Sequence, residues 1–299
     1  MGVRYKRSFG GVVFDAANYG ILFIFALLCF YPFYYILIYS VSDPLLAEVG
    51  LTIFPVRPTL MNYARIMKLP GIGRAAFISV ARTVIQTGLM MLSSGLLGYV
   101  LSRRELGLRK AIYRYFIITM YFSGGLIPTY LLMRGIGLFN NFFVYIVPGV
   151  VAVFNMILVK TYIEQLPSAL EDSAKIDGAS YLTIFYKIIV PVSMPILATI
   201  AVFGAVGQWN SWWDNLMYVP DRNLRTLQYT LWAFLQNAAE LAGFSSSMIG
   251  GLRTGGRMEL TPRSIQMTMT AVVTLPIVFV YPFMQRYFVK GIMIGAIKA

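Results

Sequence analysis

Three carboxylates and a glycine occur close together in one short polar stretch of the chain. Glu171 and Asp172 are adjacent, Asp177 follows, and Gly178 comes directly after it. Ser168 stands three residues before Glu171, which is the spacing of a capping box at the start of a helix. Carboxylates at this density can accept charge-assisted hydrogen bonds from a basic partner. We therefore expect a short acidic helix, ended by a glycine turn, that binds a soluble protein rather than an anionic membrane surface.

A second group of polar and aromatic residues lies at the end of an apolar run. Its indole, amide and carboxylate side chains are of the kind that contact sugars: Gln208, Trp209, Asn210, Trp212, Trp213 and Asp214. Arg82, inside another apolar run, is a further candidate for a substrate path, because a charge at mid-bilayer costs about 2.5 to 3.5 kcal/mol on insertion scales. The alternative for the aromatic group is a belt at the membrane interface, or helix packing.

Other kinds of chemistry are excluded by residues that the sequence lacks. It has no histidine and a single cysteine, Cys29, so the common zinc sites, a disulfide framework and a histidine-based catalytic triad are ruled out. The phosphate-binding pattern GxxxxGK[ST] is absent as well. The sequence predicts a protein that is not an enzyme and has no metal or cofactor of its own.

Membrane helices must position these groups. Of the 299 residues, 58% are hydrophobic and 12% charged, whereas soluble domains have about 45 to 50% and about 25%. A spanning helix needs about 20 mostly apolar residues. Six runs meet this requirement, at about residues 16–41, 75–101, 111–133, 142–162, 192–219 and 265–288. We expect an all-α integral membrane protein with six transmembrane helices in one domain, residues 1–299. In the third run, Gly124, Gly125 and Pro128 indicate a kink or close helix packing.

The loop charges orient these runs. The second and third runs are separated by a cationic loop, whereas only Arg134 lies between the third and fourth. The residues of the cationic loop are Arg103, Arg104, Arg109, Lys110 and Arg114. By the positive-inside rule that loop is cytoplasmic. Both termini and the acidic loop at 163–191 are then cytoplasmic too.

The segments that face outward carry more cations than carboxylates. Ten cations and five carboxylates lie in residues 42–74, around Arg134 and in 220–264, which gives a net charge of +5. This excess indicates pairing with lipid headgroups or a partner protein, or steering of an anionic solute.

The acidic loop resembles a signature of the permease subunits of binding-protein-dependent ABC importers. That signature is Glu-Ala-Ala, three residues, Gly, and then an apolar run with Ile and Pro. Here it is matched in register by Asp172, Ser173, Ala174 and Gly178, followed by Ala179, Ser180, Phe185, Ile188, Pro191 and Pro195. Asp172 and Ser173 depart from its first two positions, and Glu171 supplies a carboxylate one position earlier. The run from Gln285 to Lys298 is similar to that of the maltose-type six-helix permeases.

The resemblance implies a type I ABC importer permease fold. In that fold a cytoplasmic coupling helix between spans four and five docks into a separate ATPase. The implied coupling residues are Glu171, Asp172, Ala174, Asp177, Gly178, Ala179 and Ser180. The outer loop at 220–264 can probe a binding protein in this family, which makes Arg253 and Arg257 candidates for that contact.

The resemblance also implies partners, a substrate class and a location. The partners are a homologous permease in a heterodimer, two ATPases that hold ATP and Mg²⁺, an extracytoplasmic solute-binding protein and membrane lipid, with no nucleic acid. The location is the bacterial cytoplasmic (inner) membrane. The substrate is a sugar, and the outer cations favour an acidic, alginate-like saccharide over a neutral oligosaccharide.

Two other classes of protein fit the residues less well. An ion-coupled secondary transporter needs buried carboxylates along its path, and only Asp214 lies inside a predicted span; the chain also shows no inverted halves. A membrane enzyme needs a nucleophile with a base, and histidine is absent.

Overall fold

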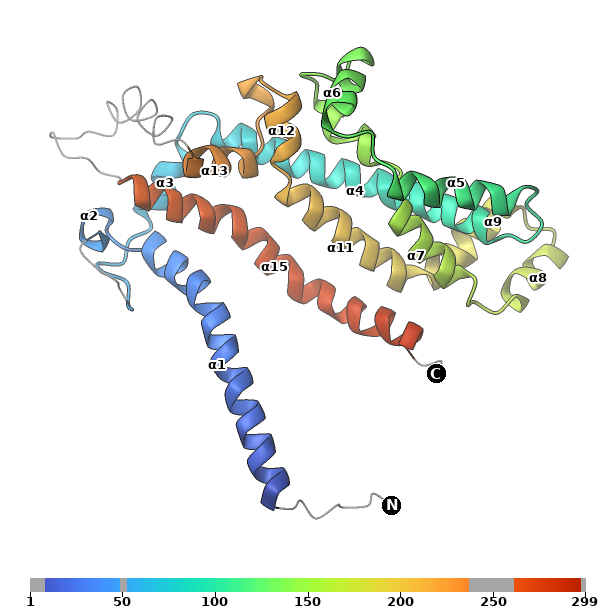
Figure 1. The fold of residues 1–299 in the computed structure, drawn as a ribbon, viewed down its shortest axis with the longest axis horizontal. Helices are drawn as coiled ribbons and strands as arrows, with labels where there is room; N and C mark the ends of the chain where they lie inside the picture. The colour runs from blue at the N-terminus through green and yellow to red at the C-terminus, as the bar shows by residue number, and fades with distance from the viewer. Residues whose placement is uncertain (1–8, 49–52, 237–260, 297–299) are drawn as a thin grey trace. The chain divides into compact units, whose positions relative to one another are not determined.

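The computed structural model describes residues 9–48, 53–236 and 261–296 (Figure 1). Within these ranges all regular secondary structure is helical. The elements are α1 (Phe9–Ser40), α2 (Pro44–Ala47), α3 (Met61–Met67), α4 (Ile72–Ser102), α5 (Arg109–Tyr121), α6 (Leu126–Gly135), η1 (Phe142–Tyr145), η2 (Val147–Gly149), α7 (Val153–Ile163), α8 (Ala169–Ile176), α9 (Tyr181–Ile184), η3 (Phe185–Ile189), α10 (Val190–Val192), α11 (Met194–Asn210), α12 (Trp213–Tyr218), η4 (Arg222–Leu224), α13 (Leu227–Gln236) and α15 (Pro262–Ala296).

Three helices are long and apolar enough to cross a membrane by themselves. These are α1, α4 and the Pro262–Val280 part of α15. Three further spans are possible as bent pairs, formed by α5 with α6, by Phe142–Gly149 with α7, and by Tyr181–Val192 with α11. The all-helical membrane architecture is therefore confirmed, and the described helices provide up to six spans.

The third, fourth and fifth predicted spans are not continuous helices; the fourth consists of η1, η2 and α7, with a bend of 41° at the break. In the third, α5 and α6 meet at 113°, and Gly125 takes the left-handed φ of +83° at the break, so the predicted kink is confirmed. The fifth was expected to run to residue 219, but α11 ends at Asn210 and α12 begins at Trp213. The carboxylate of Asp214 accepts the Asn215 N–H and the Ser211 hydroxyl, which stabilises a new helix start instead of a continuous helix.

The chain divides into two compact units, 1–69 with 237–272 and 70–236 with 273–299. The prediction of one domain stays a prediction. In the first unit, α3 is fixed to the end of α1 by Asn62, whose buried amide donates to the Ser40 and Ser42 carbonyls at 2.9 and 2.8 Å. Asp43 caps α2 by accepting from the Leu45 and Leu46 amides. Most of α1 is exposed: only 6% of its most apolar window is buried within the chain.

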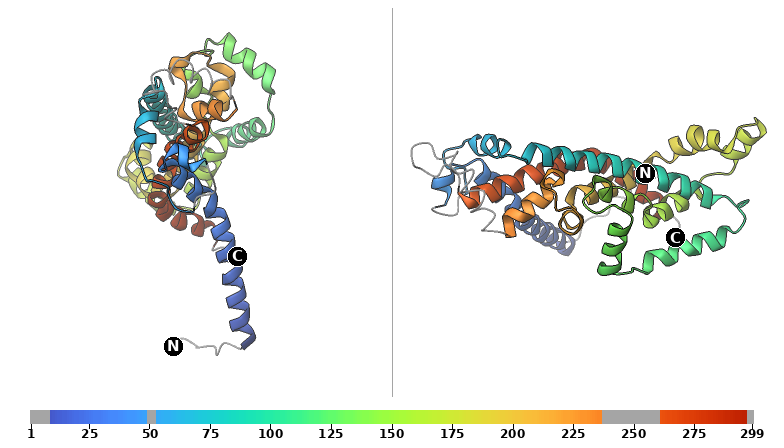
Figure 2. Two further views of the ribbon diagram at one scale, coloured as in Figure 1. Left: turned by 90° about the vertical axis from the view of Figure 1, so that its left-hand side faces the viewer. Right: turned by 90° about the horizontal axis from the view of Figure 1, so that it is seen from above.

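In the second unit, α4 is the central helix, and α7 and α11 run beside it (Figures 1 and 2). The α8–α9 segment lies at one end of α4 and α12 with α13 at the other (Figure 1). One apolar core cluster of this unit consists of Met90, Tyr99, Val159, Ile163, Ala174, Ile184, Phe185, Ile189, Leu197 and Ile200. Tyr99 and Phe185 contact each other in it, with ring centroids 5.4 Å apart. Ala174 of α8 and Tyr99 of α4 belong to this same cluster, which connects the acidic helix to α4.

Gly98 permits the close approach of α4 and α7, which gives a stability prediction. A Cβ at Gly98 would lie 2.9 Å from Val159 Cγ1 and 3.0 Å from the Lys160 backbone nitrogen. We expect Gly98→Ala to destabilise the protein by about 1 to 3 kcal/mol, as overpacked cores do. Gly88, in the same helix, has nothing within 4 Å of the equivalent atom. Thermal unfolding in detergent should therefore show a lower Tm for Gly98→Ala only, and equal Tm values for the two variants would contradict this packing.

Candidate functional site

The acidic helix α8 ends in the glycine turn that the sequence predicts. Gly178 has φ +76°, a conformation that side chains other than glycine rarely adopt. The Ala179 amide donates to the Ala174 carbonyl at 2.9 Å, and the Gly178 amide donates to the Lys175 carbonyl at 3.0 Å. This pair of hydrogen bonds is a Schellman motif. Ser180 then caps α9, because its Oγ accepts the Thr183 amide at 3.3 Å.

The predicted capping box at the start of α8 is wrong. Ser168 already has helical backbone angles, φ −62° and ψ −28°, and its side chain makes no capping hydrogen bond. Its carbonyl accepts the Glu171 and Asp172 amides instead. The Glu171 side chain is directed to Arg103, with which it forms an ion pair. A distant cation has therefore replaced the local partner that the spacing predicts.

The two faces of α8 differ in exposure. Glu171 and Ala174 are buried, with 6% and 8% of their surface exposed. Asp172 and Asp177 are exposed, and so is Ile176, at 85%. The structure therefore separates two carboxylates that the sequence grouped together: Glu171 is part of the protein interior, whereas Asp172 is available to a partner.

Ion pairs connect the acidic helix α8 to the segment that follows α4. Besides Arg103–Glu171, Lys175 Nζ lies 2.8 Å from Glu105 Oε1. The hydrogen bond between them lowers the pKa of Glu105 and raises the pKa of Lys175, so both are charged at neutral pH. The stabilisation from Glu105 is lost as the pH falls through its lowered pKa, and that from Lys175 as the pH rises through its raised pKa.

A second polar cluster lies on α4 near its other end. Arg82, which is 1% exposed, donates from Nε and Nη2 to Gln208 Oε1 at 3.0 and 2.7 Å. Its Nη2 lies 2.5 Å from Asp214 Oδ2. The guanidinium carbon is 4.4 Å from the Tyr145 ring centroid. Three predicted path residues, Arg82, Gln208 and Asp214, therefore lie together, and their polar groups pair with one another.

The predicted tryptophans have different surroundings. Trp212 stacks on Trp232, with ring centroids 4.9 Å apart and planes at 9°. Trp213 is 48% exposed, and Asn210 is exposed. The Trp209 indole N–H donates to the Val273 carbonyl at 2.9 Å. Trp212 and Trp209 are therefore engaged within the chain, whereas Trp213 and Asn210 are open to contact.

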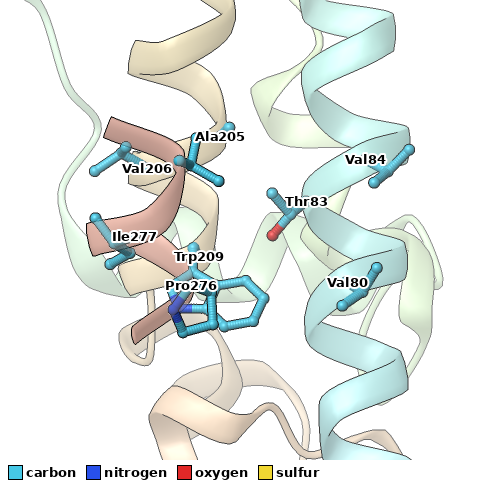
Figure 3. A pocket seen from close by; sticks show the side chains of 9 residues that line it. Val80, Thr83, Val84, Ala205, Val206, Trp209, Pro276 and Ile277 are labelled. Carbon is cyan, nitrogen blue, oxygen red and sulfur yellow. The ribbon is translucent and has the colours of Figure 1, made fainter. Parts of the chain in front are cut away.

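Trp209 also lines an apolar pocket of about 210 Å³ between α4, α11 and α15. Figure 3 shows Thr83 and Trp209 on opposite sides of it. The lining residues are Val80, Thr83, Val84, Ala205, Val206, Trp209, Pro276, Ile277 and Val280. A sugar in this pocket would leave hydroxyl groups unpaired, at about 1 to 3 kcal/mol each. The geometry favours packing, not sugar contact, for Trp209.

Three residues that the sequence reasoning did not assign to either site belong to these clusters. Arg103 and Glu105 bind the acidic helix, and Tyr145 covers Arg82. In the sequence, the charge of Arg103 directly after an apolar run indicates the orientation of the chain in the membrane, but it does not indicate pairing with the acidic helix. The candidate binding-protein contacts Arg253 and Arg257 lie outside the described residues.

The chain combines helices of membrane-spanning length with an acidic helix and a glycine turn at one end of α4. Residues 94–294 match the binding-protein-dependent transport system inner membrane component family. The chain belongs to this family, and it is a membrane protein.

Similarity to individual proteins extends over nearly the whole chain. The polygalacturonan/rhamnogalacturonan transport system permease protein YtcP of Bacillus subtilis (strain 168) is 36% identical over 290 residues, covering 96% of this chain and 98% of that protein. Protein LplC of the same organism is 34% identical, covering 96% of each chain.

Two solved structures share the fold. A chain from a bacterial ABC transporter involved in the import of the acidic polysaccharide alginate has a TM-score of 0.86 and 26% identity, covering 95% of this chain and 99% of that one. A chain from an alginate ABC transporter in complex with a periplasmic protein that holds an alginate pentasaccharide has a TM-score of 0.54 and 15% identity, and it supports the fold alone. The type I permease fold predicted from the acidic loop is confirmed.

Proposed function

We propose that this chain is the permease subunit of an ATP-driven importer of acidic oligo- or polysaccharides. The exposed face of α8 supports this proposal most directly, because it presents a carboxylate and a large apolar side chain, Asp172 and Ile176, beside the Gly178 turn. Such a short, rigid helix fits a groove on a soluble partner. In this proposal the partner is a separate ATPase, which binds ATP and Mg²⁺ and supplies the energy of transport.

Each predicted coupling residue has a place in this proposal. Asp172 pairs with a basic residue in the ATPase groove, and Asp177 is the exposed C-cap residue of α8. Gly178 makes the turn, Ser180 starts α9, and Ala179 packs partly against the core. Ala174 and Glu171 do not contact the ATPase in this proposal, because both are buried; they hold α8 against the rest of the chain.

The substrate class rests on charge and on the relatives. The predicted outer segments carry a net charge of +5, which favours an anionic solute. A 36% identical relative is named for polygalacturonan and rhamnogalacturonan, and the similar solved structure is an importer of an acidic polysaccharide. We infer that uronate-containing saccharides are the substrates.

The orientation in the membrane is a separate inference. The cationic loop between the second and third predicted spans favours a cytoplasmic location of both termini.

The remaining partners complete the assembly. A homologous permease forms the second half of the path in a heterodimer, two ATPases bind on the cytoplasmic side, and a binding protein delivers the saccharide outside. The family itself is named for dependence on a binding protein. Arg253 and Arg257 are proposed to contact that protein. Deleting residues 243–257 should therefore slow release of saccharide from the binding protein without changing ATPase association.

The ion-coupled alternative has little support in the described residues. It needs a carboxylate that can take up and release protons, and Asp214 is paired with Arg82 and accepts from Ser211 and Asn215. The carboxylate of Asp214 is therefore already engaged by three partners within the chain.

Uptake by proteoliposomes that contain the reconstituted complex tests the proposal. We expect oligogalacturonate and the binding protein outside, with ATP and Mg²⁺ inside, to give uptake. A proton gradient without ATP should give none. A neutral oligosaccharide of equal length serves as the substrate control. Uptake driven by the gradient alone would contradict the ATP-driven reading, and preference for the neutral saccharide would contradict the substrate class.

A further inference from the structure

Two ion pairs attach one face of the acidic helix to the segment that directly follows α4. Arg103 pairs with Glu171, and Glu105 pairs with Lys175. Glu171 and Lys175 are four residues apart, so they lie on the same face of α8. The two pairs therefore hold that face along about one helical turn.

The two pairs differ in strength. Arg103–Glu171 is mostly shielded from solvent, with side chains 19% and 8% exposed. The Arg103 guanidinium also lies 4.6 Å from the Tyr99 ring centroid and donates to the Ser102 hydroxyl at 2.9 Å. Lys175–Glu105 is 33% and 58% exposed, and exposed pairs contribute little. Arg103–Glu171 is therefore the pair that fixes α8.

A further ion pair involves Arg82, which lies on α4. Arg82 lies 21 residues before Arg103, which is the C-cap residue of the same helix; the two are therefore roughly 30 Å apart at 1.5 Å per residue. There Arg82 binds Gln208, near the end of α11, and Asp214, in α12. Thus α4 connects the acidic helix to the polar cluster, with one ion pair directly after its last residue and another within its first half.

We propose that Arg103 and Glu171 are positioning residues for energy coupling, which make α8 and α4 move as one body. This inference rests on the proposed function. The ATPase binds the exposed face of α8, and the Arg103–Glu171 pair transmits the displacement of α8 to α4. Neither residue contacts the ATPase or the saccharide.

Charge reversal and charge exchange test this role in the reconstituted complex. Glu171→Arg should lower saccharide transported per ATP hydrolysed about tenfold, within the range by which residues of a connecting network change coupling. The exchange variant Arg103→Glu with Glu171→Arg should restore most of that loss. Arg104→Glu, at the exposed neighbouring position, is the matched control and should transport as the unmodified protein does.

Hydrogen exchange in residues 166–178 of the purified chain gives a readout that does not depend on transport. The segment should lose protection in Glu171→Arg and regain it in the exchange variant. Unchanged protection in Glu171→Arg overturns the inference. If protection follows the expected pattern while the unmodified complex shows no ATP-driven uptake, the proposed function fails and the pairing stands.

A cross-link separates movement as one body from a pair that must open during transport. Arg103→Cys with Glu171→Cys, in a Cys29→Ala background that removes the single native cysteine, is joined by a bis-methanethiosulfonate reagent. We expect the unlinked variant to transport poorly and the linked one to regain uptake. Abolition of the residual uptake on linking would overturn the proposal.

Discussion

Replacing Asp172 with lysine should abolish ATP-driven uptake while leaving the permease folded. Asp172 is exposed on α8, and exposed substitutions usually change stability by less than about 0.5 kcal/mol. Loss of a charge-assisted contact is worth about 1.5 to 3 kcal/mol, which corresponds to about 10- to 100-fold weaker binding of the ATPase. Pull-down of the ATPase and uptake should fall together, with an unchanged melting temperature.

The control for this prediction is a reversal on the partner. Changing the basic groove residue of the ATPase to glutamate should restore binding to the Asp172→Lys permease. Normal uptake by Asp172→Lys would show that this carboxylate does not couple the two proteins. Combining Glu171→Lys with Asp172→Lys is a poorer test, because Glu171 is buried and paired, so its reversal also disturbs the packing of the loop.

Breaking the Arg82–Asp214 pair should have the largest effect on stability. Removing one partner of a buried ion pair costs about 3 to 5 kcal/mol, because the other charge is left uncompensated. Asp214→Leu leaves Arg82, which is 1% exposed, without its carboxylate, whereas Arg82→Met leaves a carboxylate that is 23% exposed. We therefore expect Asp214→Leu to be the more destabilising of the two, with both well below the unmodified protein in Tm.

A double-mutant cycle checks that the cost arises from the pair. The combined variant Arg82→Met with Asp214→Leu should be more stable than the sum of the single effects predicts. Arg74→Met, on the same helix, is the matched control, because Arg74 is exposed and its Nε donates only to the Asn223 carbonyl among the contacts of the described residues. Strict additivity of the two single effects would contradict the structure of this cluster.

Local sequence patterns predicted the parts of this structure that local forces determine. The apolar runs mark the helices, because lipid cannot satisfy exposed backbone groups. Gly178 and Gly125 mark their breaks, and both adopt positive φ. The cap at Ser180 is a local contact of the same kind, because its partner, Thr183, is three residues away.

Contacts between distant segments could not be predicted in this way. Arg82 was identified as a charge inside a span, but its partners are 126 and 132 residues further along the chain. Ser168 and Glu171 have the spacing of a capping box, yet Glu171 pairs with Arg103 across the packed core. The break between α11 and α12 likewise involves a distant contact, because Asp214, in the first turn of α12, pairs with Arg82 on α4.

Cross-linking from position 176 tests the central claim most directly. Ile176 is 85% exposed, on the face of α8 that we propose binds the ATPase. In a Cys29→Ala background, Ile176→Cys in the purified, assembled transporter should cross-link to the ATPase through a short bifunctional maleimide. Ile136→Cys, which follows α6 and replaces a residue 55% exposed, should not. An Ile176→Cys permease that reacts freely with a water-soluble maleimide in the assembled complex, and never links to the ATPase, would contradict the account.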